Sequence, residues 1–111
     1  MDTDPNDGAE ATQAARVEHR PEDGQYLVEL DGHTAYLNYE LRGRTMVLTH
    51  TAVPTEFEGR GIGGALVKFV LDDVRSRGLV VVPVCPFVRT VIRDNPEYRD
   101  LVNFDDPGAR D

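Results

Sequence analysis

The sequence predicts one small α/β (α+β) domain, in which a three-stranded antiparallel meander is followed by a single β–α–β crossover. Two observations predict this order of elements. Apolar side chains alternate with polar ones from Gln25 to Val53, with tight-turn residues between the runs, as in paired strands. The spacing then becomes helical from Ile62 to Val74, and an unbroken apolar run follows. A length of 111 residues fits one domain, which we place at residues 24–102.

The meander consists of three runs separated by glycine turns. The first run, residues 25–30, ends at Asp31-Gly32, where glycine tolerates positive φ and aspartate bonds its own backbone. The second run, residues 34–41, ends at Arg42-Gly43. The third run, residues 45–53, is rich in β-branched side chains, which favour strands.

The crossover consists of one helix and one buried strand. The apolar side chains of the helix recur at Ile62, Leu66, Val70 and Val74, and Gly78 is placed to end it. Leu79–Cys85 is apolar without alternation, which is typical of a strand covered on both faces. Strands three and four of such a unit should lie parallel. Two short helical segments are expected after them, at residues 87–93 and 96–102.

The net charge of −8 is concentrated at the chain ends. Residues 1–23 carry seven acidic side chains and residues 103–111 carry three, whereas residues 24–102 carry ten acids against nine Lys and Arg. We predict both ends to be disordered acidic tails. The nearly neutral centre lacks the basic footprint that nucleic acid requires, so no nucleic-acid partner is expected.

No membrane or metal partner is expected either. The longest apolar run, Leu79–Val82, is far shorter than a membrane span of about 20 residues. The acidic N-terminal segment does not have the pattern of a signal peptide. A single cysteine excludes an internal disulfide and a cysteine-based metal site. We therefore expect a cytoplasmic monomer.

The most informative segment is a glycine-rich turn before the helix, which comprises Gly59, Arg60, Gly61, Ile62, Gly63 and Gly64. A helix N-terminus presents unpaired N–H groups and the positive end of the helix dipole, which together suit a phosphate. Glycines let that backbone approach an anion without a Cβ atom in the way. These residues are therefore candidates for binding a phosphate-bearing cofactor. The side chain of Arg60 points either to that phosphate or to water.

The glycine turn has a second interpretation, in which the glycines only permit close packing of the helix on the sheet. It is not a P-loop, because no Gly-Lys-Ser/Thr follows. A dinucleotide-binding fold is poorly supported, because the spacing is G-x-G-x-G-G and antiparallel strands precede it. An unrelated nucleotide-binding domain that shares only this turn is a further alternative.

The turn and its surroundings resemble the GNAT acetyltransferase superfamily. The acetyl-CoA motif of that superfamily reads Gln/Arg-x-x-Gly-x-Gly/Ala, and Glu58-Gly59-Arg60-Gly61-Ile62-Gly63 occupies its frame with Glu58 in place of Gln or Arg. Residues 25–102 are similar to its minimal YjdJ-type branch of short proteins, most specifically at Pro83-x-Cys85-Pro86 and Asn95-Pro96-Glu97-Tyr98. In that branch an acidic residue often stands where this chain has Ala52.

This resemblance implies a GNAT-like fold with acetyl-CoA as co-substrate and with strands three and four splayed apart. The diphosphate would lie on backbone N–H groups of Gly59–Gly64, and the pantetheine arm would pair with the backbone at Val53, Pro54 and Thr55. Pro83 and Pro86 have no N–H, which is a physical reason for the splay. The implied activity is transfer of acetyl, by direct attack, to an amine of a small molecule, peptide or protein.

Two residues are candidates for catalysis. Cys85 ends the strand beside the implied thioester, where it would protonate the CoA thiolate, become acetylated, or serve only as a small buried hydrophobe. His50 is expected on the strand face of Met46 and Leu48, as a base, a positioning group or a core residue. Backbone N–H groups near Val53 are candidate oxyanion donors. The alternative function is a degenerate domain that binds acetyl-CoA or CoA without efficient catalysis.

Overall fold

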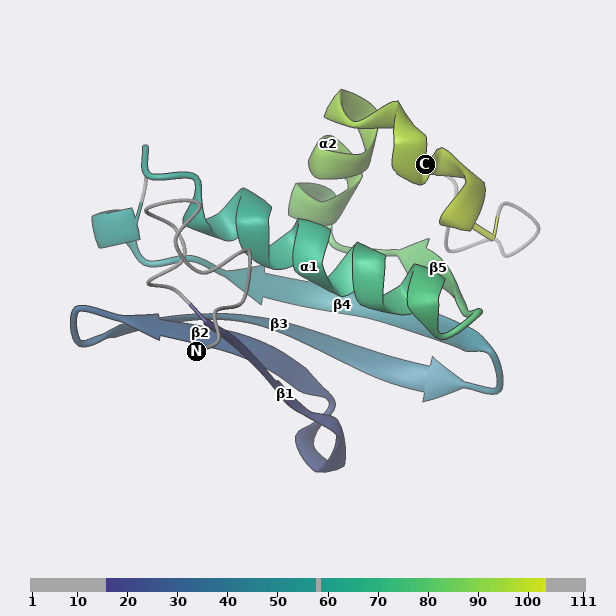
Figure 1. Ribbon diagram of the computed structural model, residues 1–111, viewed down its shortest axis with the longest axis horizontal. Coiled ribbons are helices and arrows are strands. Elements are labelled where there is room, and N and C mark those ends of the chain that lie inside the picture. The colour runs from purple at the N-terminus through teal and green to yellow at the C-terminus, as the bar shows by residue number, and fades with distance from the viewer. Residues whose placement is uncertain (1–15, 58, 104–111) are drawn as a thin grey trace, which may run out of the picture.

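The computed structural model describes residues 16–57 and 59–103 of the chain. Its elements are β1 (Val17–Arg20), η2 (Pro21–Asp23), β2 (Gln25–Leu30), β3 (His33–Arg42), β4 (Thr45–Ala52), η3 (Thr55–Phe57), α1 (Ile62–Ser76), β5 (Val80–Pro83), α2 (Pro86–Asp94) and η4 (Pro96–Leu101). The five strands form one sheet in the order β1-β2-β3-β4-β5. α1 lies across one face of the sheet, and α2 stands beside it near β4 and β5 (Figure 1).

The predicted fold class is confirmed. β2, β3 and β4 form an antiparallel meander, and β4 pairs with β5 in parallel, with α1 as the crossover between them. The loop from β2 to β3 is a two-residue turn in which Asp31 (φ 55°) and Gly32 (φ 81°) both have positive φ. That combination is the one a tight hairpin turn needs, because its twist matches the twist of the strands.

The ordered domain begins earlier than predicted. β1 pairs antiparallel with β2, from Val17 opposite Val28 to Arg20 opposite Gln25. The prediction that the disordered tail extends to residue 23 is therefore wrong. The acidic composition of this segment indicated disorder, but four of its residues form a strand. At the other end, the N–H of Asn103 donates to the carbonyl of Val81. The remaining parts of the two predicted tails lie outside the described residues.

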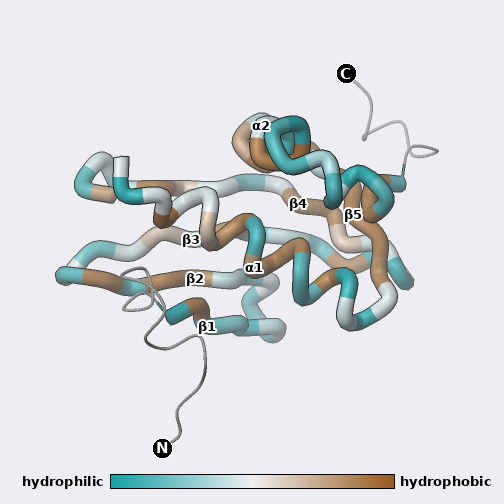
Figure 2. The backbone as a smooth tube through the Cα atoms, turned by 45° about the horizontal axis from the view of Figure 1, so that its top comes forward, coloured by the Kyte–Doolittle hydropathy of each residue, from teal (hydrophilic) through white to brown (hydrophobic). Residues whose placement is uncertain are grey.

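The core lies between α1 and the inner face of the sheet. Apolar and polar residues follow one another along α1 (Figure 2). Its apolar residues are buried except Ala65 and Phe69, the latter 44% exposed. The largest fully buried side chains of the molecule are Tyr26, Phe57, Leu37, Met46, Leu48, Leu66 and Leu71. α1 ends as predicted, because Gly78 (φ 70°) turns the chain while the N–H of Leu79 bonds to the carbonyl of Val74 at 3.0 Å.

A β-bulge changes which residues of β4 face the core. Tyr39 pairs with Leu48 but Asn38 pairs with His50, so one residue of β4, Thr49, is extra. An extra residue reverses the alternation of a strand beyond it. Met46 and Leu48 are buried, whereas His50 is exposed on the opposite face. The prediction that His50 shares the face of Met46 and Leu48 is therefore wrong.

β4 and β5 separate at their carboxyl ends, as predicted. Their pairing stops at Leu48 and Pro83, and the N–H groups of Val84 and Cys85 both bond to the carbonyl of Leu48, at 3.1 and 3.0 Å. β4 continues to Ala52 without a partner in β5. The chain leaves β5 through Pro86, which occupies the first turn of α2, where its missing N–H costs nothing.

Candidate functional site

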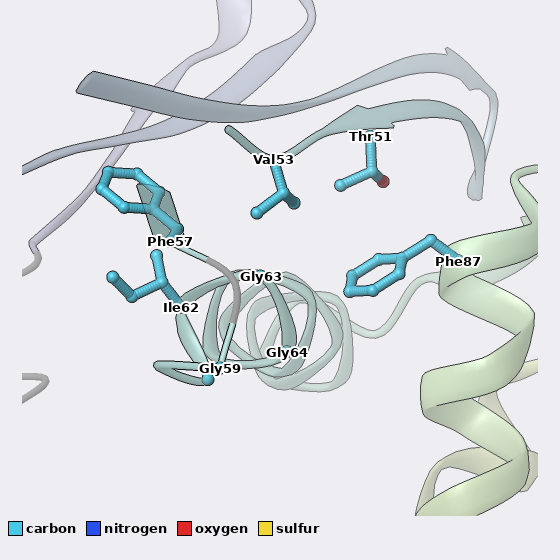
Figure 3. Close-up of a pocket in the computed structure, with 9 residues that line it drawn as sticks. Thr51, Val53, Phe57, Gly59, Ile62, Gly63, Gly64 and Phe87 are labelled. Carbon is cyan, nitrogen blue, oxygen red and sulfur yellow. The ribbon is translucent and has the colours of Figure 1, made fainter. Parts of the chain in front are cut away.

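A pocket of 420 Å³ lies where β4 and β5 separate. Its walls come from the end of β4, η3, the glycine turn, the first turn of α1 and the start of α2 (Figure 3). The described residues that line it are Thr51, Val53, Phe57, Gly59, Gly61, Ile62, Gly63, Gly64 and Phe87. Six of the nine predicted cofactor-binding residues are in this lining: Val53, Gly59, Gly61, Ile62, Gly63 and Gly64.

The start of α1 presents backbone N–H groups to the pocket. Gly61 precedes the helix in the left-handed conformation (φ 74°), and no side chain caps the helix end. The N–H of Ala65 bonds to the carbonyl of Gly61 at 3.0 Å, which closes the first turn. The N–H groups of Ile62, Gly63 and Gly64 precede that bond and have no intrahelical acceptor. This end of the helix is therefore suited to an anion.

Two neighbouring glycines serve different purposes. A Cβ atom on Gly63 would lie 2.9 Å from Cγ2 of Val53 and 3.1 Å from Cζ of Phe87. Gly63 is thus required by packing, as the second interpretation of the turn proposed. A Cβ atom on Gly64 would meet no protein atom within 4 Å, although Gly64 lines the pocket. Packing does not require glycine at position 64, and the space beside it is open to a ligand.

The other three predicted cofactor-binding residues lie outside the pocket lining. The carbonyl of Pro54 accepts the N–H of Phe57 at 2.9 Å, which closes η3 with Thr55 as its first residue. The guanidinium of Arg60 lies 3.4 Å from a carboxylate oxygen of Asp31 and over the ring of Phe57. Its backbone N–H bonds to the carbonyl of Phe57. Arg60 therefore points toward the β2–β3 turn rather than into the pocket.

Cys85 is buried where β5 gives way to α2. Its Sγ lies 3.4 Å from Oγ1 of Thr51, which lines the pocket. Burial alone would raise the pKa of the thiol. Hydrogen bonds that the Thr51 hydroxyl and the backbone N–H groups of Val88, Phe87 and Thr51 donate to the thiolate form outweigh burial, so the pKa of Cys85 lies below its usual value. The thiol is thus beside the pocket and easier to ionise than a free cysteine.

His50 is separated from this group by the sheet. Its ring lies near that of Tyr36, with 6.1 Å between the centroids, on the exposed face. The structure therefore does not bring the two predicted catalytic residues together. His50 is accessible only to a molecule that approaches from the face of the sheet opposite α1.

Sequence reasoning missed Thr51 and Phe87 as pocket residues. Simple alternation from Met46 places Thr51 on the outer face, and only the bulge at Thr49 turns it inward. Phe87 is 38% exposed, which is unusual for a large apolar side chain. The signal that could have found Phe87 is its position directly after Cys85-Pro86, in the first turn of α2, where β5 ends beside the gap.

No group of three or more His, Cys, Asp or Glu side chains in residues 16–57 and 59–103 is placed to hold a metal ion. Within the same residues, no helix has the length and apolar character to cross a membrane.

Comparison with known proteins gives one consistent family. The family described as GCN5-related N-acetyl-transferase matches residues 25–101. Protein NATD1 of Xenopus tropicalis is 36% identical over 93 residues, which cover 81% of this chain and 85% of the relative. The human Protein NATD1 is 38% identical over 84 residues, 73% of this chain and 74% of the relative. A GCN5-like protein from Staphylococcus aureus, solved by NMR, has the same fold, with a TM-score of 0.64 and 21% identity over 78% of this chain and 86% of that one.

Proposed function

Because the chain belongs to the GCN5-related N-acetyltransferase family, we propose that it binds acetyl-CoA in the 420 Å³ pocket and transfers the acetyl group to an amine. The amine belongs to a small molecule, a peptide or a protein. The observation that carries the proposal is the uncapped start of α1, whose N–H groups face a pocket with open space at Gly64. A phosphate of the CoA diphosphate fits such an end.

The rest of the pocket suits the remaining parts of the ligand. Val53 and Phe87 provide apolar walls on either side of the gap between β4 and β5. In that gap the backbone of β4 after Leu48 has no β5 partner, so those of its polar groups that bond neither to β3 nor to Cys85 are available to an extended chain. The pantetheine arm would occupy this position.

Acetyl-CoA, when bound, supplies the acetyl group and a thiolate leaving group. Cys85 holds a proton on Sγ, and its lowered pKa makes that proton easier to give up near neutral pH. Thr51 lies between this thiol and the pocket. We infer that Cys85 donates its proton to the CoA thiolate as that thiolate leaves. His50 would act only on an acceptor that approaches from the other face of the sheet.

A specific observation also favours the alternative of binding without efficient turnover. No carboxylate or imidazole is among the described residues that line the pocket. These described residues include no base to take the proton from an ammonium acceptor. If this alternative holds, acetyl-CoA stabilises the protein but no CoA is released beyond the uncatalysed rate.

Binding is tested by thermal denaturation with acetyl-CoA, CoA, ATP and NAD. A ligand that binds only the folded protein stabilises it by about 2.7 kcal/mol at 100 times its Kd. We expect acetyl-CoA and CoA to raise the Tm, and ATP and NAD to have a much smaller effect. Stabilisation by ATP or NAD alone would instead support an unrelated nucleotide-binding domain.

The variant Gly64→Asp tests the location of the ligand. Aspartate in the first turn of a helix favours folding, but its carboxylate would occupy the open space and repel a phosphate. We expect the fold to persist and the Tm increase with acetyl-CoA to be lost. Lys68→Gln is the matched control, because it changes the net charge by the same amount at an exposed position of α1 outside the pocket. An equal Tm increase in wild type and Gly64→Asp would overturn the proposed site.

Turnover is tested by release of free CoA thiol in the presence of a panel of amines. We expect release by the wild type and slower release by Cys85→Ala. Unchanged release by Cys85→Ala would remove Cys85 from the mechanism. Stabilisation by acetyl-CoA with no release for any amine would support the binding-only alternative.

A further inference from the structure

Thr51 is distinguished from every other residue around the pocket. Among the described lining residues it alone has a polar side chain, since the others are glycines, Val53, Ile62 and two phenylalanines. It reaches the pocket only because of the bulge at Thr49. Its hydroxyl lies 3.4 Å from Sγ of Cys85, which precedes α2 and is 34 residues away in the sequence.

We propose that Thr51 is the positioning residue for Cys85, holding the thiol at the pocket and hydrogen-bonding to sulfur in both of its protonation states. This inference rests on the proposed function, which uses Cys85 as a proton donor. In the resting state the S–H donates to Oγ1 of Thr51. When the proton leaves, the Thr51 hydroxyl rotates and donates its own hydrogen to the thiolate, because a hydroxyl is both a donor and an acceptor.

Hydrogen bonds are the main interactions that stabilise the thiolate of Cys85. The main groups that lower the pKa of Cys85 are the Thr51 hydroxyl and the backbone N–H groups of Val88, Phe87 and Thr51. On α2, Nε of Arg89 donates to the carbonyl of Pro83 at 2.7 Å. Of the main groups that lower the pKa of Cys85, only the Thr51 hydroxyl belongs to a side chain. Substitution of Thr51 can therefore change the ionisation of the Cys85 thiol without altering the backbone.

Strand packing alone does not explain a threonine at position 51. Valine has the same shape and an equal preference for strands. A hydroxyl in a partly buried position costs free energy unless it is hydrogen-bonded, and the bond recorded for the Thr51 side chain is the one to Cys85. The hydrogen bond to Sγ of Cys85 therefore explains the hydroxyl of Thr51 better than the packing of β4 does.

The test compares Thr51→Val with Thr51→Ser in the protein without ligand. Cys85 is the sole cysteine, so the rate of alkylation by iodoacetamide reports on it alone. The ultraviolet absorbance of the thiolate is taken as the difference from Cys85→Ala, which removes the contribution of the four tyrosines. We expect Thr51→Val to raise the pH midpoint of both signals and to slow alkylation near neutral pH by roughly threefold or more, since reactivity follows the thiolate fraction. Thr51→Ser retains the hydroxyl and should restore the wild-type midpoint. Thr34→Val, the same change at an exposed site of β3, should leave the midpoint unchanged.

The outcomes separate this inference from the proposed function. A wild-type midpoint in folded Thr51→Val would overturn the positioning role, as would Thr51→Ser behaving like Thr51→Val. Neither measurement involves acetyl-CoA, so failure of acetyl-CoA to bind would refute the proposed function without altering them. If both hold, Thr51→Val should slow release of CoA and Thr51→Ser should restore it.

Discussion

The two ends of α1 are built in opposite ways. At its start the helix has no side-chain cap, three glycines in or near its first turn line a pocket, and backbone N–H groups are left without intrahelical acceptors. At its end, the N–H of Gly78 bonds to the carbonyl of Arg75, and that of Leu79 bonds to Val74. The start of α1, at Gly61–Gly64, leaves backbone polar groups available, and we call it the open end. The other end, at Asp73–Leu79, bonds its polar groups within the protein, and we call it the closed end.

The closed end is joined to β1, β2 and β3 through side chains. The hydroxyl of the buried Tyr26 donates to Asp73 at 2.6 Å, and Nε of Arg77 donates to the same carboxylate oxygen at 2.9 Å. His19 stacks on Tyr26 with 4.0 Å between ring centroids. Burial, followed by the bond to Asp73, raises the pKa of Tyr26 far above its usual value, so its hydroxyl stays protonated and donates.

The same half of α1 also holds the C-terminal η4. Arg75 contacts Asp100 through two bonds of 2.9 and 3.0 Å and donates to the carbonyl of Glu97. The hydroxyl of Tyr98 donates to Asp72 at 2.9 Å, and burial with this bond raises the pKa of Tyr98 to about 12. Polar groups with protein partners therefore mark the half of α1 that holds the fold together. Polar groups left without them mark the half that we assign to a ligand.

The largest expected effect is at the closed end, in the variant Asp73→Ala. It removes the acceptor of the buried Tyr26 hydroxyl and the partner of Arg77. Leaving a buried donor unsatisfied costs about 1–3 kcal/mol, and we expect a loss of roughly 2–3 kcal/mol in the free energy of unfolding by urea. The Tm increase with acetyl-CoA should stay as large as in wild type, because the pocket is at the other end of the helix.

Tyr26→Phe sharpens this result. This variant removes the hydroxyl donor, whereas Asp73→Ala leaves the donor buried without an acceptor. Asp73 also keeps Arg77 as its partner. We therefore expect a smaller loss of stability than in Asp73→Ala. A change below about 0.5 kcal/mol in Asp73→Ala, which is typical of an unimportant surface site, would contradict the structural role given to this end.

The next effect is at the open end and compares two adjacent glycines. Glycine-to-alanine changes within a helix usually stabilise it by roughly 0.5–1 kcal/mol, which we expect for Gly64→Ala. Gly63→Ala should instead destabilise by about 1–2 kcal/mol, because the new methyl group is too close to Val53 and Phe87. Chemical denaturation of both variants checks the opposite signs, and equal signs would show that the contact at Gly63 relaxes without cost.

The sequence predicted the order of the strands from Gln25 onward, the crossover helix and the glycine turn at the pocket, because each follows from local spacing. It did not predict β1, whose four residues are too short for alternation to stand out among charges. It also misplaced His50 and missed Thr51, because the bulge at Thr49 depends on how β3 pairs with β4 and not on either strand alone. The site could be located from sequence, but the side chains that face it required the strand register.

The smallest effect is a pH dependence at the closed end, through His19. Arg77 can only donate hydrogen bonds, so Nδ1 of His19, 3.3 Å away, accepts, and Nε2–H donates to the Tyr39 hydroxyl at 2.6 Å. This arrangement needs a neutral ring. Burial and the charge of Arg77 lower the pKa of His19, and they outweigh the opposing effects of Asp73 and Glu22.

A lowered pKa means that the unfolded chain binds the proton more tightly than the folded protein does. Between the lowered pKa of His19 and its unfolded value, about 6.5, stability should therefore rise with pH, and it should be lost as pH falls through that window. Urea denaturation between about pH 5.5 and 7.5 should show this slope in the wild type and a weaker one in His19→Gln. His50→Gln should keep the wild-type slope, because His50 is exposed on the opposite face of the sheet. If His50→Gln weakened the slope as much as His19→Gln, the dependence would come from histidine content rather than from the closed end of α1.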